Sequence, residues 1–309
     1  MYTVASFFTG CSGSDLGFES ERFDIVFSNE INTAACDTYE ANFGRRPFDV
    51  PIEYLPLAAI PEANIFIGGP PCQSFSNARS GGYSKGYQSM DGLKYIRRYA
   101  EIVEAKQPEL FIMENAPTLI KQPSKMDVLR EIINLFKSYK VRPYLLNAED
   151  YGVPQQRERT FLLGTRSDVD LVFPFIRPDT DHWKFHCSGW AEWLGLPNEG
   201  WLASRGSRLK GKSPFECAYT VIGTEVPVIR YEQPTKIKGS LFSGERVTLN
   251  QRYLTVEELA RLQGFPRDYI FCGSKNEQLL QIGNAWCVPV AQALARQAKK
   301  TLNKWRQTC

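Results

Sequence analysis

The sequence predicts an α/β fold built on a mostly parallel sheet, and three observations carry this prediction. Short apolar runs alternate with segments of helical periodicity through the first half of the chain. A turn rich in glycine and small residues follows the first apolar run, and an acidic residue ends the second. The alternation stops near Ser167, where turn residues and tryptophans become frequent. The 309 residues are enough for one large core or for a large and a small domain.

The first predicted strand, residues 2–8, leads into a turn at residues 9–13 that contains Gly10 and Gly13. Small residues between a strand and a helix let the backbone approach a ligand closely, although a merely tight turn has the same composition. The next strand, residues 24–29, ends in Glu30, about 20 residues after the glycine turn. A carboxylate at that spacing can accept hydrogen bonds from ribose hydroxyls, which favours a nucleotide-like ligand.

The apolar run at residues 65–67 predicts a buried strand that delivers Cys72 at the tip of a stiff turn. Two glycines let the chain bend as it leaves the sheet, and two prolines fix φ just before the cysteine. Most cysteines are inert buried residues, so only such a setting marks one as a nucleophile. Residues 77–92 contain four glycines and no apolar periodicity, which predicts a mobile loop, either a solvated linker or a lid over Cys72.

A helix that ends before Pro108 is predicted next, followed by a strand at residues 109–113 that delivers Glu114. Because parallel strands end at a common edge, Glu114 and Cys72 should meet there, although an acid at a strand end can also be a helix cap. A helix over residues 127–139 and a strand over 141–147 complete this part.

Arg157 and Arg159 occupy alternate positions at the start of another predicted strand. Side chains two apart share a face of a strand, so both arginines can point into one site. Paired arginines on a surface usually have no special function. The helix that follows Thr255 is predicted to have that threonine as N-cap and to stop at Gly264, and residues 281–285 are predicted to open the last helix.

Composition and cysteine spacing indicate a soluble cytoplasmic protein. No window approaches the ~18 apolar residues of a membrane span, and the N-terminal run lacks a basic leader. The eight cysteines form no C-x-x-C pair, which favours reduced thiols. His182, His186 and Cys187 could be metal ligands, but without a fourth ligand nearby we interpret them as surface and packing residues and expect no metal site.

Positive charge is concentrated between residues 201 and 252. This segment has nine basic and four acidic residues, a local excess of five, whereas the whole chain has a net charge of +3. A charge run is ordinarily a solvated face, but arginines interleaved with glycines also suit contacts to phosphates and base edges. The candidate contacts are Arg205, Arg208, Lys210 and Lys212.

Residues 68–76, Gly-Gly-Pro-Pro-Cys-Gln-Ser-Phe-Ser, resemble the catalytic motif of the cytosine-C5 DNA methyltransferases, in which the cysteine adds to C6 of the target base. Other motifs of this family occur along the chain in the family's order. The turn at residues 8–13 resembles the S-adenosylmethionine turn, Glu114-Asn115 the Glu-Asn motif, and residues 155–159 the Gln-x-Arg-x-Arg motif. Residues 252–266 and 281–285 are similar to the ninth and tenth motifs.

The sequence departs from the family pattern at three positions. Ser12 stands where a glycine is common, Ile31 where an aromatic residue often stacks on adenine, and Trp286 where the residue is usually smaller. The aspartate that contacts adenine in the family has no clear match, and Asp49 and Glu53 are the nearby acids.

The resemblance implies a Rossmann-like S-adenosylmethionine methyltransferase domain, residues 1–167 plus 281–309, with a smaller target-recognition domain at residues 168–280 that reads DNA. The implied catalytic residues are Cys72, Glu114, Asn115, Arg157 and Arg159. The implied cofactor-binding residues are Phe8, Thr9, Gly10, Cys11, Ser12, Gly13, Glu30, Ile31, Pro70, Asn284 and Ala285. The substrate-binding residues expected from the motifs and the basic stretch are Pro71, Gln73, Ser76, Arg205, Arg208, Lys210 and Lys212.

The chemistry implied is methyl transfer to C5 of a cytosine that is flipped out of duplex DNA, through a covalent bond between Cys72 and C6. An RNA (tRNA) cytosine-5 methyltransferase of the same fold and a non-catalytic DNA-binding protein are the alternatives. We expect a monomer associated with the nucleoid, and a restriction endonuclease acting on the same site is a candidate partner. The recognised sequence does not follow from these motifs.

Overall fold

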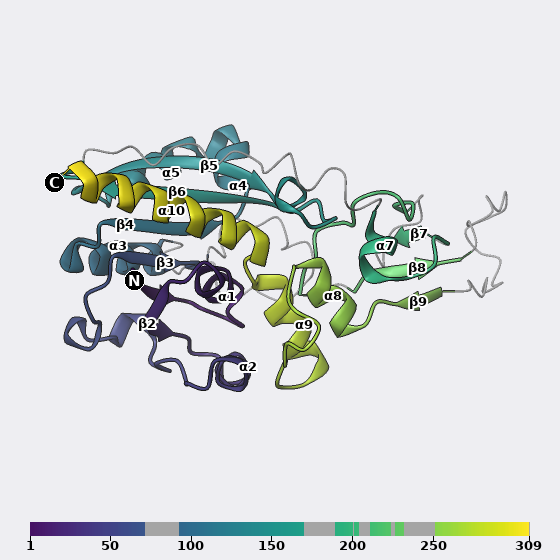
Figure 1. The fold of residues 1–309 in the computed structure, drawn as a ribbon. Helices are drawn as coiled ribbons and strands as arrows, with labels where there is room; N and C mark the ends of the chain where they lie inside the picture. The colour runs from purple at the N-terminus through teal and green to yellow at the C-terminus, as the bar shows by residue number, and fades with distance from the viewer. Residues whose placement is uncertain are drawn as a thin grey trace.

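The computed structural model describes residues 1–71, 93–169, 189–199, 201–203, 211–223, 226–231 and 251–308. A six-stranded sheet in the order β2-β1-β3-β4-β6-β5 forms its centre (Figure 1). Its strands are β1 Thr3–Phe7, β2 Asp24–Asn29, β3 Ile65–Gly68, β4 Leu110–Asn115, β5 Tyr139–Asn147 and β6 Glu158–Arg166. Strands β1 to β4 pair in parallel, and β6 is antiparallel to both β4 and β5. The predicted α/β fold is therefore confirmed.

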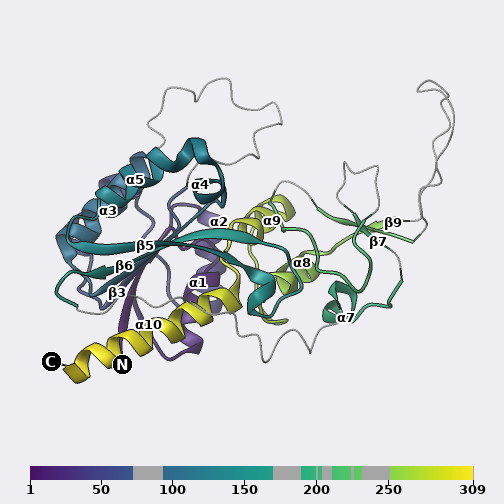
Figure 2. The ribbon, with the colours of Figure 1, turned by 90° about the horizontal axis from the view of Figure 1, so that it is seen from above.

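Helices cover both faces of this sheet, which explains why its central strands are continuous apolar runs (Figure 2). The helices α1 and α10 pack on one face, and α3 and α5 on the other. Gly17 permits the close approach of α1 to α10, because a Cβ atom there would lie 2.5 Å from Cβ of Ala291. The helices are α1 Gly13–Ser20, α2 Thr33–Phe43, α3 Lys94–Lys106, α4 Thr118–Lys121, α5 Met126–Asn134 and α10 Val288–Thr308.

A second, antiparallel sheet lies at one end of the molecule (Figure 1). Its strands are β7 Trp201–Ala203, β8 Val228–Arg230 and β9 Gln251–Tyr253, and the nearby helices are α7 Trp190–Leu194, α8 Val256–Leu262 and α9 Lys275–Asn284. One core cluster joins residues of this sheet to α8, α9 and Cys11 of the turn after β1. The division into two domains stays a prediction, and its boundary between residues 280 and 281 falls inside α9.

Short 3-10 turns connect several of these elements, at Ile52–Tyr54, Leu57–Ala59, Pro123–Lys125 and Ala148–Tyr151. Within the described ranges, no helix has both the length and the apolar character that crossing a membrane requires.

Two predicted element boundaries are wrong. The helix predicted over residues 127–139 ends at Asn134, and Tyr139 already begins β5. Phe136 and Tyr139 are buried against Phe111 as a helical pattern would require, but they reach it from a turn and a strand. Residues 281–285 end α9 instead of opening the last helix, because Ala285 adopts an extended conformation. Thr255 is the N-cap of α8 with a complete capping box, as predicted.

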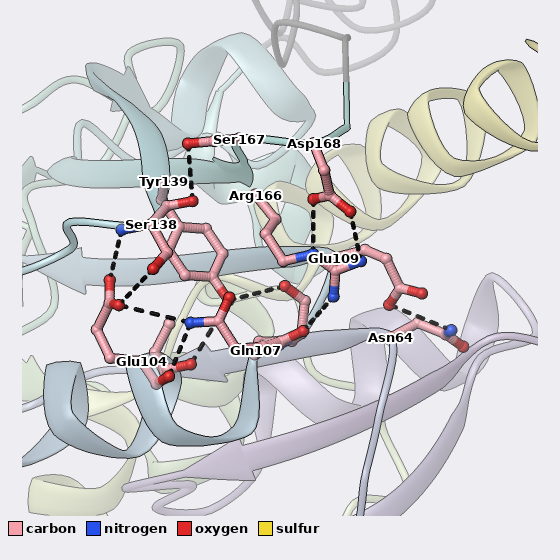
Figure 3. A network of polar contacts seen from close by, with 11 residues as sticks. Asn64, Glu104, Gln107, Glu109, Ser138, Tyr139, Arg166, Ser167 and Asp168 are labelled. Atoms are coloured by element: carbon pink, nitrogen blue, oxygen red, sulfur yellow. Dashed lines mark hydrogen bonds and ion pairs between the residues drawn. The ribbon is translucent and has the colours of Figure 1, made fainter.

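A polar network fixes the edge of the sheet where β5 begins and β6 ends (Figure 3). Arg166 donates to both carboxylate oxygens of Asp168, at 2.7 and 3.0 Å, and to the carbonyl of Gln107 at the end of α3. Glu104 of α3 accepts from the backbone and hydroxyl of Ser138. The network therefore attaches the β5–β6 pair to α3 at the edge opposite to the carboxyl ends of β1, β3 and β4.

A buried carboxyl group connects β1, α1 and α2. Asp15, in the first turn of α1, accepts hydrogen bonds from the hydroxyls of Ser6 at 2.6 Å, Ser14 at 2.9 Å and Tyr39 at 3.1 Å. Burial raises the pKa of Asp15 from 3.8 to about 6, although the three hydroxyl donors oppose this shift.

We predict that Asp15→Asn removes a pH-dependent part of the stability. A carboxyl whose pKa is higher in the folded than in the unfolded state takes up a proton on folding. Its stabilising contribution to the free energy of unfolding is therefore fully present below pH 4 and is lost as the pH rises through 6. Between pH 4 and 7 the wild type should therefore lose up to about 3 kcal/mol relative to the variant in urea unfolding. Asp24→Asn, on an exposed strand position, is the control. If the free energies of unfolding of Asp15→Asn and wild type change in parallel with pH, the prediction is wrong.

Candidate active site

Glu114 and the turn that follows β3 meet at the carboxyl edge of the sheet. Oε2 of Glu114 lies 3.5 Å from the position that a Cβ atom on Gly69 would take. The amide of Asn115 donates to the carbonyl of Pro70 at 3.3 Å, which fixes the turn against the end of β4. These contacts place the turn as far as Pro70, and the predicted meeting of Glu114 with Cys72 stays a prediction. Cys72, Gln73, Ser76 and the loop at residues 77–92 lie outside the described residues.

Glu114 forms an ion pair with Arg159 on the neighbouring strand β6. The distance from Arg159 Nε to Glu114 Oε1 is 2.9 Å, and the two side chains are 22% and 14% exposed. Burial raises the pKa of Glu114, while Arg159 and then Arg157 oppose this shift. A carboxyl group with a raised pKa is protonated more readily than an ordinary one, which suits donation of a proton to a bound base.

Arg157 has different partners from Arg159. Its guanidinium is buried and donates to three backbone carbonyls, those of Val221 at 2.8 Å, Gly283 at 2.8 Å and Ala285 at 2.9 Å. Burial, and after it the positive charge of Arg159, lower the pKa of Arg157 to about 9. The side chain thus joins the segment just before β6 to two segments that are distant in sequence.

Two buried glutamines extend this arrangement, and with Arg157 we call them the carbonyl junction (Gln155, Arg157 and Gln263). Gln155 donates to the carbonyl of Leu262 at 2.7 Å and accepts from the amide of Val221 at 2.8 Å. Gln263 donates to the carbonyl of Ile282 at 2.8 Å. Sequence analysis missed the role of the glutamines, although Gln155 begins the Gln-x-Arg-x-Arg motif.

The turn after β1 is strained and is held by Glu30. Gly10 and Ser12 have left-handed φ values of 56° and 71°. Oε2 of Glu30 accepts from the amide of Gly10 at 2.8 Å, and Oε1 accepts from the amides of Ile31 at 2.9 Å and Asn32 at 2.8 Å. Tyr269 donates to the carbonyl of Cys11 at 2.7 Å. These contacts fix the backbone of the turn next to the end of β2.

The end of α9 also reaches this turn. Ala285 is buried and Asn284 is exposed, and the carbonyl of Trp286 would lie 2.2 Å from a Cβ atom on Gly13. Only a glycine fits this approach, which brings the tenth motif beside the turn. The segment that contains Asn284 and Ala285 therefore reaches the turn that contains Gly13, and the cofactor-binding role of these residues stays a prediction.

The structure separates the two acids considered for the adenine contact. Residue 48 pairs with β2, since the amide of Phe48 donates to Ser28 at 2.7 Å and its carbonyl accepts from Glu30 at 3.2 Å. This places Asp49, which is exposed, beside the carboxyl end of β2. Glu53 instead forms an ion pair with Lys94 at 2.8 Å. Asp49 is therefore the better placed of the two.

The predicted substrate-binding residues are only partly described. Pro71 is exposed, and Lys212 lies 5.6 Å from the ring centroid of Tyr219 and 3.8 Å from Glu216. Arg205, Arg208 and Lys210 lie outside the described residues, as do His182, His186 and Cys187. A polar pocket of about 380 Å³ beside Arg159 is lined by Pro117, Asn147, Glu149, Gln156, Glu158, Arg159 and Thr220.

A glycine turn held by an acidic residue, with a second carboxyl at the same edge of the sheet, is an arrangement found in α/β enzymes. The family model described as C-5 cytosine-specific DNA methylase matches residues 2–188 and 197–300. The chain belongs to this family of DNA cytosine-5 methyltransferases.

Curated relatives match along nearly the whole chain. The type II methyltransferase M.MthTI of Methanothermobacter thermautotrophicus is 35% identical, covering 97% of each chain. M.NlaX of Neisseria lactamica is 34% identical, covering 98% of each. M1.ScrFI of Lactococcus lactis subsp. cremoris is 30% identical, covering 98% of this chain and 79% of the relative.

Solved structures show the same fold. A DNA modification methyltransferase encoded within an E. coli prophage has a TM-score of 0.74 at 20% identity, covering 98% of this chain and all of that one. The Dnmt2 methyltransferase of S. pombe has a TM-score of 0.71 at 16% identity, with coverages of 98% and 100%.

We predict that Arg157→Lys destabilises the fold strongly. An ammonium group cannot reproduce the fork that serves three carbonyls, and each buried carbonyl left without a donor costs about 1 to 3 kcal/mol. The free energy of unfolding should fall by about 2 to 4 kcal/mol in urea denaturation. Arg142→Lys, at an exposed position of β5, should change it by less than about 0.5 kcal/mol. An Arg157→Lys variant as stable as this control would show that the junction is not needed for stability.

Proposed function

We propose that the protein transfers a methyl group from S-adenosylmethionine to C5 of a flipped-out cytosine in a specific duplex DNA sequence, through a covalent bond between Cys72 and C6. The observation that carries this proposal is the buried Glu114, bonded to Arg159, beside the turn that leads to Cys72. The family membership supports the reaction class.

The proposed roles follow from the chemistry of cytosine. C5 is a poor nucleophile while the ring is aromatic, and addition of the Cys72 thiolate to C6 makes it enamine-like. Glu114 assists by hydrogen-bonding or protonating N3, and its raised pKa supports this role. Arg159 holds Oε1, which leaves Oε2 to face the base. When bound, S-adenosylmethionine supplies the electrophilic methyl group. Loss of the C5 proton to solvent water then re-forms the C5–C6 double bond and breaks the bond between C6 and sulfur, which releases Cys72 as a thiolate, and N3 returns any proton it received to Glu114.

The remaining motif residues support this arrangement in different ways. Asn115 holds the carbonyl of Pro70 and so positions the turn that carries the nucleophile. The bonds of Arg157 go to backbone carbonyls, so we propose that it acts on the site through the segments that it joins.

The residues at the turn after β1 fit S-adenosylmethionine. A carboxylate has about four acceptor positions, and three of those of Glu30 are used by backbone amides, so at least one remains for a ribose hydroxyl. Ile31 is 60% exposed and can pack on adenine, with Asp49 accepting from its amino group. We propose that Phe8, Thr9, Gly10, Cys11, Ser12, Gly13, Pro70, Asn284 and Ala285 complete the site.

Duplex DNA is the proposed substrate, read by residues 168–280 and contacted by Pro71, Gln73, Ser76 and the basic stretch that includes Lys212. The type II relatives support a role in restriction and modification, with a cognate endonuclease acting on the same site. We propose that the protein acts as a monomer in the cytoplasm, at the nucleoid. Transfer RNA is the alternative substrate.

We predict that Cys72→Ser abolishes methyl transfer, because a neutral hydroxyl lacks the nucleophilicity of a thiolate. Transfer of tritiated methyl groups to duplex DNA and to transfer RNA measures both activity and substrate. Wild-type protein should also form a gel-stable adduct with a duplex that contains 5-fluorocytosine, since fluorine prevents proton loss from C5.

Cys217→Ser, a half-buried cysteine far along the chain, is the matched control and should retain activity. Substantial turnover by Cys72→Ser, or methylation of transfer RNA alone, would overturn the proposal.

We predict that Glu30→Ala weakens S-adenosylmethionine binding by about 2 to 3 kcal/mol, because it removes charge-assisted bonds to ribose and releases the amide of Gly10. Calorimetric titration of the cofactor measures the loss, and DNA affinity should change little. Glu40→Ala, an exposed acid on α2, is the control. An unchanged cofactor affinity would assign Glu30 to turn structure alone.

A further inference from the structure

Trp286, the large residue that departs from the family pattern, lies at the active site. It is 7% exposed, and its ring contacts Phe161 edge to face, with the ring centroids 5.1 Å apart. Phe161 on β6 pairs directly with Glu114 on β4, so their side chains lie on the same face of the sheet. Trp286 therefore packs on the face from which Glu114 projects.

The indole N–H of Trp286 borders the same small space as the carboxyl of Glu114. Nε1 of Trp286 lies 3.2 Å, and Oε2 of Glu114 lies 3.5 Å, from the point where a Cβ atom on Gly69 would be. Gly69 leaves this space open, and a side chain there would fill it.

Neither of these polar atoms has a partner in the part of the chain that the structure describes. Arg159 bonds to Oε1 of Glu114, and Oε2 receives no hydrogen bond from the described residues. The indole N–H of Trp286 likewise has no acceptor among the described residues. Trp286 as a residue is 7% exposed, and a buried indole N–H usually has a hydrogen-bond partner, which a bound ligand can supply here.

We propose that Trp286 is a further substrate-binding residue, whose indole N–H donates to a ring acceptor of the target pyrimidine while Glu114 holds the neighbouring edge. The edge of cytosine presents the acceptors O2 and N3 next to a donor amino group, so it can satisfy an N–H and a carboxyl group at once. This inference rests on the proposed function, because it assumes that the base occupies the Glu114 site.

The test compares Trp286→Phe, which keeps an aromatic ring against Phe161 and removes the donor, with wild type. Single-turnover methylation and the rate of adduct formation on 5-fluorocytosine DNA should fall at least 30-fold, while the dissociation constant for S-adenosylmethionine stays within 3-fold. Trp305→Phe, a partly buried tryptophan packed on the same core cluster, is the matched control and should keep both rates.

Because the smaller ring could disturb packing, a second variant carries 3-benzothienylalanine at position 286, where sulfur replaces the N–H in a ring of the same shape. It should lose the same activity with an unchanged melting temperature. Rates within 3-fold of wild type, or a loss confined to cofactor affinity, would overturn the inference while leaving the proposed function intact. A wild-type protein that methylates no cytosine-containing duplex would overturn the proposed function as well.

Discussion

The burial of the Arg157 guanidinium is the constraint on which the arrangement of the active site depends. A charge removed from water is costly unless partners replace the lost hydration, and here the carbonyls of Val221, Gly283 and Ala285 accept from the two terminal nitrogens, whereas Nε has no partner among the described residues. Those carbonyls belong to the segment before β8 and to the end of α9. The bonds to this one cation therefore hold Val221, in the segment that we propose reads DNA, against the end of α9, which lies beside the proposed cofactor site.

Glycines and glutamines make this junction tight. A Cβ atom on Gly283 would lie 2.1 Å from the amide nitrogen of Gly223, so the two backbones touch where Arg157 bonds to both segments. Gln155 and Gln263 are fully buried, and their side-chain amides donate to the backbone carbonyls of residues 262 and 282. Since every one of these bonds links positions far apart in sequence, the junction forms only when the whole chain has folded.

The two arginines of the Gln-x-Arg-x-Arg motif have different partners: Arg159 pairs with a carboxylate, and Arg157 bonds to backbone carbonyls. Arg159 stays half-buried and compensates Glu114, whose carboxyl is raised in pKa by burial. Arg157, two residues earlier, also places positive charge near Glu114, but it donates its hydrogen bonds to backbone carbonyls. Glu114 therefore keeps one oxygen oriented by a cation and one oxygen free of partners among the described residues, which suits a group that must exchange a proton.

The sequence by itself determined the parallel sheet, the glycine turn with Glu30, and the position of Glu114 at a strand end, because these depend on local apolar runs and turn chemistry. The sequence also indicated Cys72 as the candidate nucleophile, because the motif that identifies it is a short continuous stretch, residues 68–76. Only the tertiary structure decided that Arg157 bonds to carbonyls, that Asp49 rather than Glu53 lies beside β2, and that Trp286 packs next to Glu114. Each of these rests on contacts between distant segments, whose geometry no local pattern encodes. The same reason explains the end of α5: Phe136 and Tyr139 are buried as a helix would bury them, but the strand pairing of β5 determines their backbone.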